Sequence, residues 1–87
     1  MAGKFQCTVV TPESSVLDEQ VSYATIPAHD GQVGFMPHRA PILMQLGQGQ
    51  MRLELASGGQ RTAEISGGFA QMRGDQLTIL TDKADLS

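Results

Sequence analysis

The chain has 87 residues and a net charge of −3, from six Lys and Arg against nine Asp and Glu, with Cys7 as its one cysteine. This length allows one domain with one modest core, and a lone cysteine excludes an internal disulfide and fits a reducing compartment. The cations are scattered and aromatic rings are few, which argues against nucleic-acid binding. The sequence has no long apolar run and no secretory signal, so we expect no membrane insertion. Together these features predict a soluble intracellular module.

In the first half of the chain, apolar and polar residues alternate with a period of two, which predicts short strands rather than helices. These strands are expected at residues 4–10, 16–17, 21–26, 32–36 and 42–46. Cys7 alternates with Phe5 and Val9, so we expect it to be a small buried hydrophobe rather than a reactive thiol. Pro27 lacks an amide donor and is expected to end the strand at 21–26.

The second half predicts two hairpins, with strands at residues 51–55, 60–65, 69–73 and 76–80. Gly74-Asp75 joins the last two strands, and such a pair is typical of a tight hairpin turn. Gly67 and Gly68 predict either a close approach of two backbones or a bulge with positive φ.

The end of the chain, residues 83–87, is polar and is expected to form a tail with a pattern typical of a helix start. The ordered core is expected to cover about residues 4–82. Short strands with turn signals between them predict that residues 1–87 form a single all-β domain, a β-sandwich or flattened barrel.

The candidate catalytic residues are His29, Asp30 and His38, which supply two imidazoles and a carboxylate, with Arg39 beside them. A metal-dependent enzyme that uses these three side chains is an open alternative, although their spacing matches no metal-binding motif and solvated histidines are the simpler interpretation. The glycine pairs lack the strand–loop–helix context and the lysine of a phosphate-binding loop. The residues therefore predict no catalytic site, no cofactor and no metal site.

Residues 30–43 combine two glycines, two prolines and an apolar run, which predicts a rigid turn between two strands. Apolar side chains surround this turn, and the candidates for exposure are Phe35, Met36, Ile42, Met44 and Leu46. Such side chains either fill an irregular core or adapt to a partner. A docking face for another protein and the groove of a generic β-sandwich ligand-binding module are both open interpretations.

Three motifs, in the same order and spacing, carry a resemblance to a known family. They are Val9-Val-Thr-Pro-Glu13, residues 31–37 together with 40–43, and Ser66-Gly-Gly-Phe69 followed by residues 77–82. In these motifs the chain resembles the N-terminal β-sandwich domain of the epsilon subunit of F-type ATP synthases, called delta in mitochondria. The resemblance covers essentially the whole chain. It implies a ten-stranded flattened β-sandwich, with the C-terminal helical hairpin of the family absent from these residues.

The resemblance also implies a function. It implies a non-catalytic subunit of the central stalk, which couples the gamma subunit to the membrane ring of c subunits during ion-driven ATP synthesis. The chain would then be no enzyme by itself and would bind no cofactor. Its expected location is the cytoplasmic face of the bacterial plasma membrane, or the matrix or stroma side in an organelle, as part of a peripheral complex.

The resemblance implies two sets of site residues. The residues expected to contact the c ring are Asp30, Gly31 and Gln32. The residues expected to contact gamma are Thr11, Arg39 and Met44. Relatives often hold a glutamate where this chain has Gln32, so an ion pair with the ring would become a neutral hydrogen bond. Relatives also commonly have a histidine where this chain has Arg39, which makes the charge of that turn permanent.

Overall fold

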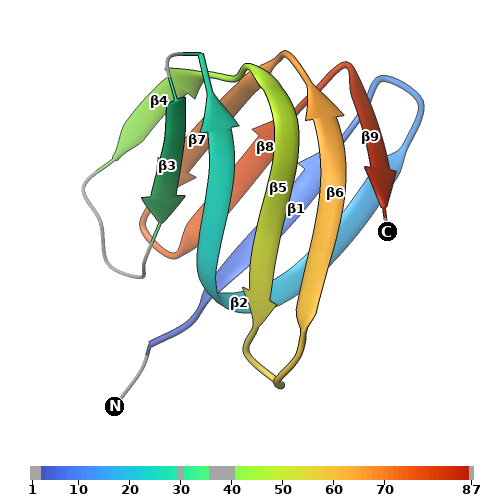
Figure 1. The fold of residues 1–87 in the computed structure, drawn as a ribbon. Helices are drawn as coiled ribbons and strands as arrows, with labels where there is room; N and C mark the ends of the chain where they lie inside the picture. The colour runs from blue at the N-terminus through green and yellow to red at the C-terminus, as the bar shows by residue number, and fades with distance from the viewer. Residues whose placement is uncertain (1–2, 30, 36–40, 87) are drawn as a thin grey trace.

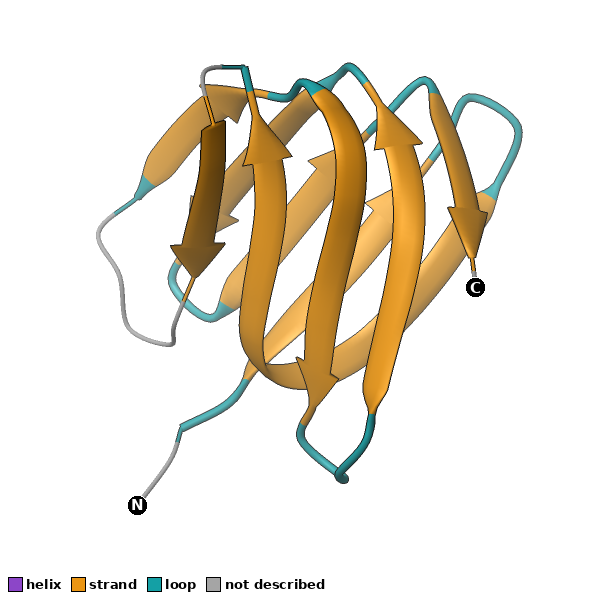
Figure 2. Ribbon diagram, in the orientation of Figure 1, coloured by secondary structure: helices purple, strands orange, loops and turns teal. Residues whose placement is uncertain are grey.

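The computed structural model describes residues 3–29, 31–35 and 41–86. Within these ranges the chain forms strands and no helix (Figure 2). The strands are β1 (Phe5–Val10), β2 (Ser15–Ala28), β3 (Gly31–Phe35), β4 (Ile42–Gln45), β5 (Gln48–Leu55), β6 (Gln60–Ser66), β7 (Phe69–Arg73), β8 (Gln76–Leu80) and β9 (Lys83–Leu86). The all-β prediction is confirmed. The resemblance implied ten strands, whereas the described residues form nine.

The strands pack as two layers that share β2 (Figure 1). One layer has the order β4-β7-β8-β1 and continues into the first half of β2, and the other has β3, the second half of β2, β5, β6 and β9. The pair β1–β8 is parallel and the other strand pairs are antiparallel. The sheet does not close into a barrel, so the predicted β-sandwich is the observed architecture.

The long strand β2 corrects the sequence-based prediction of two separate strands that end at Pro27. Its first half pairs with β1, from Ser15 to Val21, and its second half pairs with β5 from Val21 onward. A register irregularity between Val21 and Tyr23 lets the strand bend from one layer into the other, as bulges do. Pro27 is tolerated near the strand end because the pairing of β2 with β5 stops at Thr25, so the ladder needs no amide hydrogen from Pro27. Its carbonyl accepts a hydrogen bond from the Gly47 amide at 2.9 Å.

The last strand, β9, corrects the prediction of a polar tail after residue 82. Residues 83–86 pair antiparallel with β6, from Ser66↔Lys83 to Ala63↔Leu86, and only Ala84 is half-buried. An edge strand needs few apolar side chains, and charged residues on it block pairing with other chains. For this reason its composition resembled that of a loop.

The core between the layers consists of buried apolar side chains from both sheets. They are Phe5, Cys7, Val9, Leu17, Val21, Ala24, Ile26, Leu46, Met51, Leu53, Ala63, Ile65, Ala70, Met72, Leu77 and Ile79. Cys7 is fully buried, as predicted, and burial raises the pKa of its thiol from 9.0 to about 12, with a smaller contribution from the Asp18 carboxylate.

Two connections cross between the layers side by side, at the end of the sandwich drawn uppermost in Figure 1. The Leu46 amide donates to the Gly68 carbonyl at 2.9 Å, and the Gly67 amide donates to the Gly47 carbonyl at 3.1 Å. Gly68 has φ 101°, and a Cβ atom there would overlap the Leu80 carbonyl oxygen. The predicted close approach of two backbones and the positive φ are observed at this glycine pair, and the strand pairs on either side of it show no register shift. We call residues 46–47 and 67–68 the interlayer corner.

Thr81 fixes a third crossing next to this corner. Its amide donates to the Val10 carbonyl at 3.0 Å, and its buried hydroxyl lies 2.8 Å from the Gly67 carbonyl oxygen. Thr81 therefore ties the ends of β1 and β8 to the interlayer corner.

Candidate functional site

The catalytic alternative finds no support among the described residues. No group of three or more His, Cys, Asp and Glu side chains within them is placed to hold a metal ion. His29 is exposed in the turn after β2, whereas Asp30, His38 and Arg39 lie outside the described residues. The Cys7 thiol is buried and its raised pKa keeps it protonated at neutral pH, so it is a poor nucleophile. In the part of the chain that the structure covers, no helix is long and apolar enough to cross a membrane.

Two of the three residues expected at the c ring, Gly31 and Gln32, lie at the start of β3. Gly31 and Gln32 are exposed, and the Gln32 side-chain amide donates to the Gln50 carbonyl at 3.5 Å. The adjoining His29 amide donates to the Gln45 carbonyl at 3.0 Å, which links this turn to the end of β4. Asp30, the third residue of this set, falls outside the described ranges. Gly31 and Gln32 are thus exposed at the start of a strand, beside hydrogen bonds to both layers.

The residues expected at gamma are less exposed. Thr11 is 9% exposed, and its hydroxyl lies 3.2 Å from the Ser14 carbonyl oxygen in the turn between β1 and β2. Met44 is half-buried, pairs with the buried Ala70 and packs against the core. Arg39 is not among the residues that the structure describes. Thr11 and Met44 belong to the same layer, but β7 and β8 separate their strands, so they do not form one patch.

An exposed apolar surface, which the sequence analysis missed, lies between Thr11 and Met44. Phe69 on β7 and Leu80 on β8 are each 52% exposed and are direct cross-strand neighbours. Val10 on β1 is half-buried and pairs with Leu80 on the other side. We call Phe69, Leu80 and Val10 the apolar strip. It crosses three adjacent strands on the outer face of its layer.

The alternation along β7 and β8 could have revealed this strip. Ala70 and Met72 are buried, as are Leu77 and Ile79, so the period of two places Phe69 and Leu80 on the outer face. Large apolar side chains at outward positions are the informative exceptions to such a pattern.

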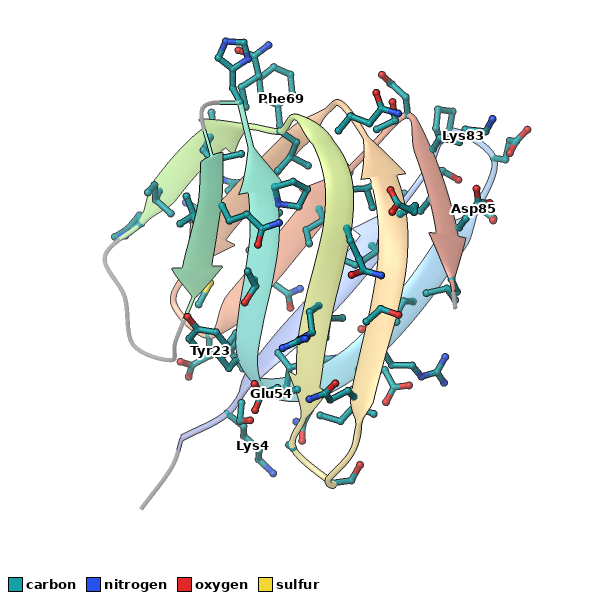
Figure 3. The ribbon with its side chains drawn as sticks, viewed as in Figure 1. Lys4, Tyr23, Glu54, Phe69, Lys83 and Asp85 are labelled. Atoms are coloured by element: carbon teal, nitrogen blue, oxygen red, sulfur yellow. The ribbon has the colours of Figure 1, made fainter. Side chains whose placement is uncertain are left out.

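A hollow of about 360 Å³ adjoins the apolar strip. Its walls come from the strip, from the turn after β1 and from the crossing after β8, and its lining residues are Val10, Thr11, Pro12, Gly68, Phe69, Leu80, Thr81 and Asp82. Thr11 thus reaches the candidate surface after all, as part of this hollow. Figure 3 shows Phe69 and Lys83 at the end of the sandwich that carries the crossings, and Tyr23, Glu54 and Lys4 at the opposite end.

The outer face of the second layer is different. Its central strands β5 and β6 expose polar and charged side chains, among them Gln50, Arg52, Glu54 and Glu64. The contrast between the two layers makes the apolar strip a candidate interaction surface.

Comparison with known proteins identifies the family to which this fold belongs. Residues 4–87 match the family model described as the ATP synthase Delta/Epsilon chain beta-sandwich domain. The chain is 40% identical over 79 residues to the ATP synthase epsilon chain of Rhodopirellula baltica, covering 91% of this chain and 61% of that one. It is 39% identical over 87 residues to the epsilon chain of Syntrophobacter fumaroxidans, covering 98% of this chain and 63% of that one. The chain therefore spans less than two thirds of the length of these relatives.

Solved structures agree with the same assignment. A chain in the Euglena gracilis mitochondrial ATP synthase, from a structure of OSCP, F1 and c-ring, superposes with a TM-score of 0.89 at 26% identity, covering 95% of this chain and 53% of that chain. A chain from the Tetrahymena thermophila mitochondrial ATP synthase shares the fold, with a TM-score of 0.76 at 16% identity, covering 95% of this chain and 66% of that chain. The family match covers nearly every residue, and the chain belongs to the family of beta-sandwich domains of ATP synthase delta and epsilon chains.

Proposed function

We propose that this chain is a non-catalytic rotor subunit of a rotary ATP synthase and couples the gamma subunit to the c ring during ion-driven ATP synthesis. Membership of the delta and epsilon family supports the proposal, as does the likeness to a chain of an assembly that contains F1 and the c-ring. The chain would then be part of a membrane-associated complex. Its location would be the cytoplasmic face of a bacterial plasma membrane, or the matrix or stroma side in an organelle.

The structural observation that carries this proposal is the backbone connection between the two candidate surfaces. The turn before β3 is bonded to β4 through the His29 amide and the Gln45 carbonyl, at 3.0 Å. The interlayer corner then bonds β2 to the crossing before β5, through the Gly47 amide and the Pro27 carbonyl at 2.9 Å. Backbone hydrogen bonds between sequence-distant segments resist local deformation. A part that transmits torque between two partners needs this stiffness.

The c-ring contact is proposed for Asp30, Gly31 and Gln32. Gln32 supports it by its exposed neutral amide, which offers hydrogen bonds to the polar loops of a ring without an ion pair. The gamma contact is proposed for Thr11, Arg39 and Met44.

We include the apolar strip in the proposed gamma contact. The strip adjoins Thr11 in the same hollow. Met44 is directed toward the core, so its contribution would come from supporting β4 rather than from direct contact.

A binding experiment tests the partners. Purified chain should bind isolated gamma subunit and should show no ATP hydrolysis alone. Gln32→Lys should weaken binding to detergent-solubilised c ring and leave gamma binding within about twofold, because the two surfaces lie on different strands. If the wild-type chain fails to bind either gamma or the c ring, the proposed function is wrong.

A further inference from the structure

We propose that Tyr23 is a positioning residue for the start of β3, because its ring lies over Gly34 and thereby selects one of two registers open to this strand. The selected register presents Gly31 and Gln32, two of the residues proposed to contact the c ring. The part of the inference that concerns the c ring rests on the proposed function, whereas the choice of register does not depend on it.

The register of β3 is set by one neighbouring strand. Among the described strands β3 pairs with β2 and with no other, from Ala24↔Phe35 to Ala28↔Gly31. Two of its five residues are glycines, and glycine-rich strands specify their register weakly. The position of Gln32 on the surface therefore depends on the contacts that hold β3 against β2.

The sequence of the turn before β3 favours a register that differs from the observed one. In the structure, two residues lie between the paired residues Ala28 and Gly31. Asp30-Gly31, however, is a dipeptide typical of a two-residue hairpin turn. A turn formed by those two residues would shift β3 by two positions along β2. The local turn signal and the observed pairing thus disagree.

The alternation of buried and exposed residues does not decide between the two registers. In the observed register Val33 lies opposite Ile26 and packs against the core. After a shift by two positions Val33 would lie opposite Ala28 and would still face the core. Because such a shift keeps each side chain on its own face of the sheet, a contact other than core burial has to select the register.

Tyr23 on β2 and Gly34 on β3 supply such a contact on the outer face of the layer. Tyr23 is half-buried, and Figure 3 shows it at the C-terminal end of β3. Gly34 pairs with Thr25, so Tyr23 is its diagonal neighbour and an aromatic side chain can reach it. A Cβ atom on Gly34 would overlap the Tyr23 hydroxyl oxygen and would lie 2.8 Å from Cζ. The end of the ring therefore occupies the space that a side chain at this position would need.

This contact exists in the observed register alone. In the shifted register Met36 would take the place of Gly34 opposite Thr25, and its side chain would compete with the ring for the same space. An aromatic ring laid over a strand glycine stabilises the pairing that brings the two together. The shift would also move Gln32 by about 7 Å along the strand, since each residue rises about 3.4 Å.

The test compares variants of Tyr23 and Gly34. Tyr23→Ala removes the ring, Tyr23→Phe keeps it, and Gly34→Ala adds a side chain beneath it. The double variant with both alanines removes the ring and the overlap together. Gly58→Ala is the matched control, because it also replaces a glycine but no atom lies within 4 Å of its Cβ position. Tyr23→Thr replaces Tyr23→Ala if the latter unfolds.

Two measurements separate register from binding. Backbone NOE contacts measured by NMR report the register, because Ile26 faces Val33 in the observed register and would face Phe35 in the shifted one. The affinity for detergent-solubilised c ring is measured beside the affinity for gamma. The melting temperature of each variant is recorded as well.

For Tyr23→Ala and Gly34→Ala we expect NOE contacts of the shifted register to appear and c-ring affinity to fall about fivefold, because apparent affinity falls with the population of the competent register. Gamma affinity should stay within about twofold. Tyr23→Phe should keep the register and the c-ring affinity. The double variant should lose no more than Tyr23→Ala alone, since both changes act on one contact. Gly58→Ala should lower the melting temperature and leave register and c-ring affinity unchanged, which separates positioning from stability.

Three outcomes would overturn the inference while the proposed function stands. In the first, Tyr23→Ala shows the NOE contacts of the observed register alone. In the second, the register shifts but c-ring affinity does not change. In the third, Tyr23→Phe loses as much as Tyr23→Ala, so the ring contact is not the cause. Absence of c-ring binding by the wild type would instead contradict the proposed function, and the NMR measurement would still decide whether Tyr23 selects the register.

Discussion

Single residues at the interlayer corner decide how closely the two layers approach. Gly68 adopts φ 101°, a conformation that residues with a Cβ rarely adopt, and its Cα faces the backbone of the crossing after β8. The Leu80 carbonyl oxygen stands where a Cβ would be, and Thr81 Cα lies 2.7 Å from that position. Backbone atoms cannot move aside as the tip of a long side chain can. Gly68 is therefore required both for its conformation and for its lack of a side chain.

Substitution of Gly68 by valine should destabilise the fold by about 3 kcal/mol or more, well above the ~1 kcal/mol of a typical point change, because strain and overlap add. Chemical denaturation measures this change. Gly58→Ala is the control, since Gly58 also has a positive φ, of 98°, but no atom lies within 4 Å of its Cβ position. Gly58→Ala should lose only about 1 kcal/mol. Equal stabilities for both variants would show that the close contact at Gly68 has no energetic weight.

Burial of Cys7 makes the stability of the fold decrease at alkaline pH. The pKa of its thiol is raised to about 12 in the folded chain, mainly by burial, from an ordinary value of 9.0. The buried, protonated thiol contributes fully to the free energy of unfolding below pH 9. This contribution is lost between pH 9 and about 12, because the thiol of the unfolded chain loses its proton in that range and the thiol of the folded chain does not.

In that range the free energy of unfolding should fall by up to about 1.4 kcal/mol per pH unit, and Cys7→Ala should remove this part of the slope. Denaturation of both proteins at pH 8 and pH 10 measures it. A thiol reagent should also leave folded Cys7 unmodified at pH 8 and label it in denaturant. Identical slopes for the two proteins would contradict the assigned burial.

At the scale of strands, the hairpin β7–β8 was predicted with its bounds, because the period of two and Gly74-Asp75 are local signals. The extent of β2 was not predictable in this way. Its continuity depends on a bend that appears only when β1 and β5 are both in place. β9 was missed because its pairing with β6, not its composition, makes it a strand. Local pattern determines elements that carry their own turn signals, and long-range pairing determines the others.

The candidate surfaces also differ in whether the local sequence pattern could predict them. The sequence predicted a strand that begins at Gln32, and the structure places both Gly31 and Gln32, exposed, at the start of β3. It did not find the apolar strip, because Phe69 and Leu80 are adjacent only after β7 and β8 pair. Whether a side chain such as Met44 is directed toward the core or toward a partner also depends on which layer covers it, and no single strand carries that information.

Removal of β9 tests the element that the sequence missed. A chain that ends at residue 82 should melt several degrees lower than one that ends at residue 86, since it loses the pairing with β6 and the packing of Ala84. It should also associate at high concentration, because the edge of β6 becomes exposed. Calorimetry and sedimentation measure the two effects. Equal melting temperatures would show that residues 83–86 behave as a tail.

At the scale of the whole molecule, the proposed function makes the sandwich a spacer between two partners. Its long β2 belongs to both layers, and the interlayer corner joins their ends by backbone hydrogen bonds. The start of β3 and the apolar strip both lie next to this corner, so a force applied at one surface would reach the other through the corner. Nothing in this arrangement needs a reactive group, and stiffness is the property that the proposed coupling role requires.

The most direct test of this account is the number of ions pumped per ATP hydrolysed by membrane vesicles that carry the synthase. Complex depleted of this subunit is compared before and after addition of the chain. We expect the chain to raise pumping per ATP severalfold, and Gly47→Val, whose Cβ would lie 2.8 Å from the Ala28 carbonyl oxygen, to restore less of it at equal occupancy. Equal pumping per ATP with and without the bound chain would contradict the coupling role.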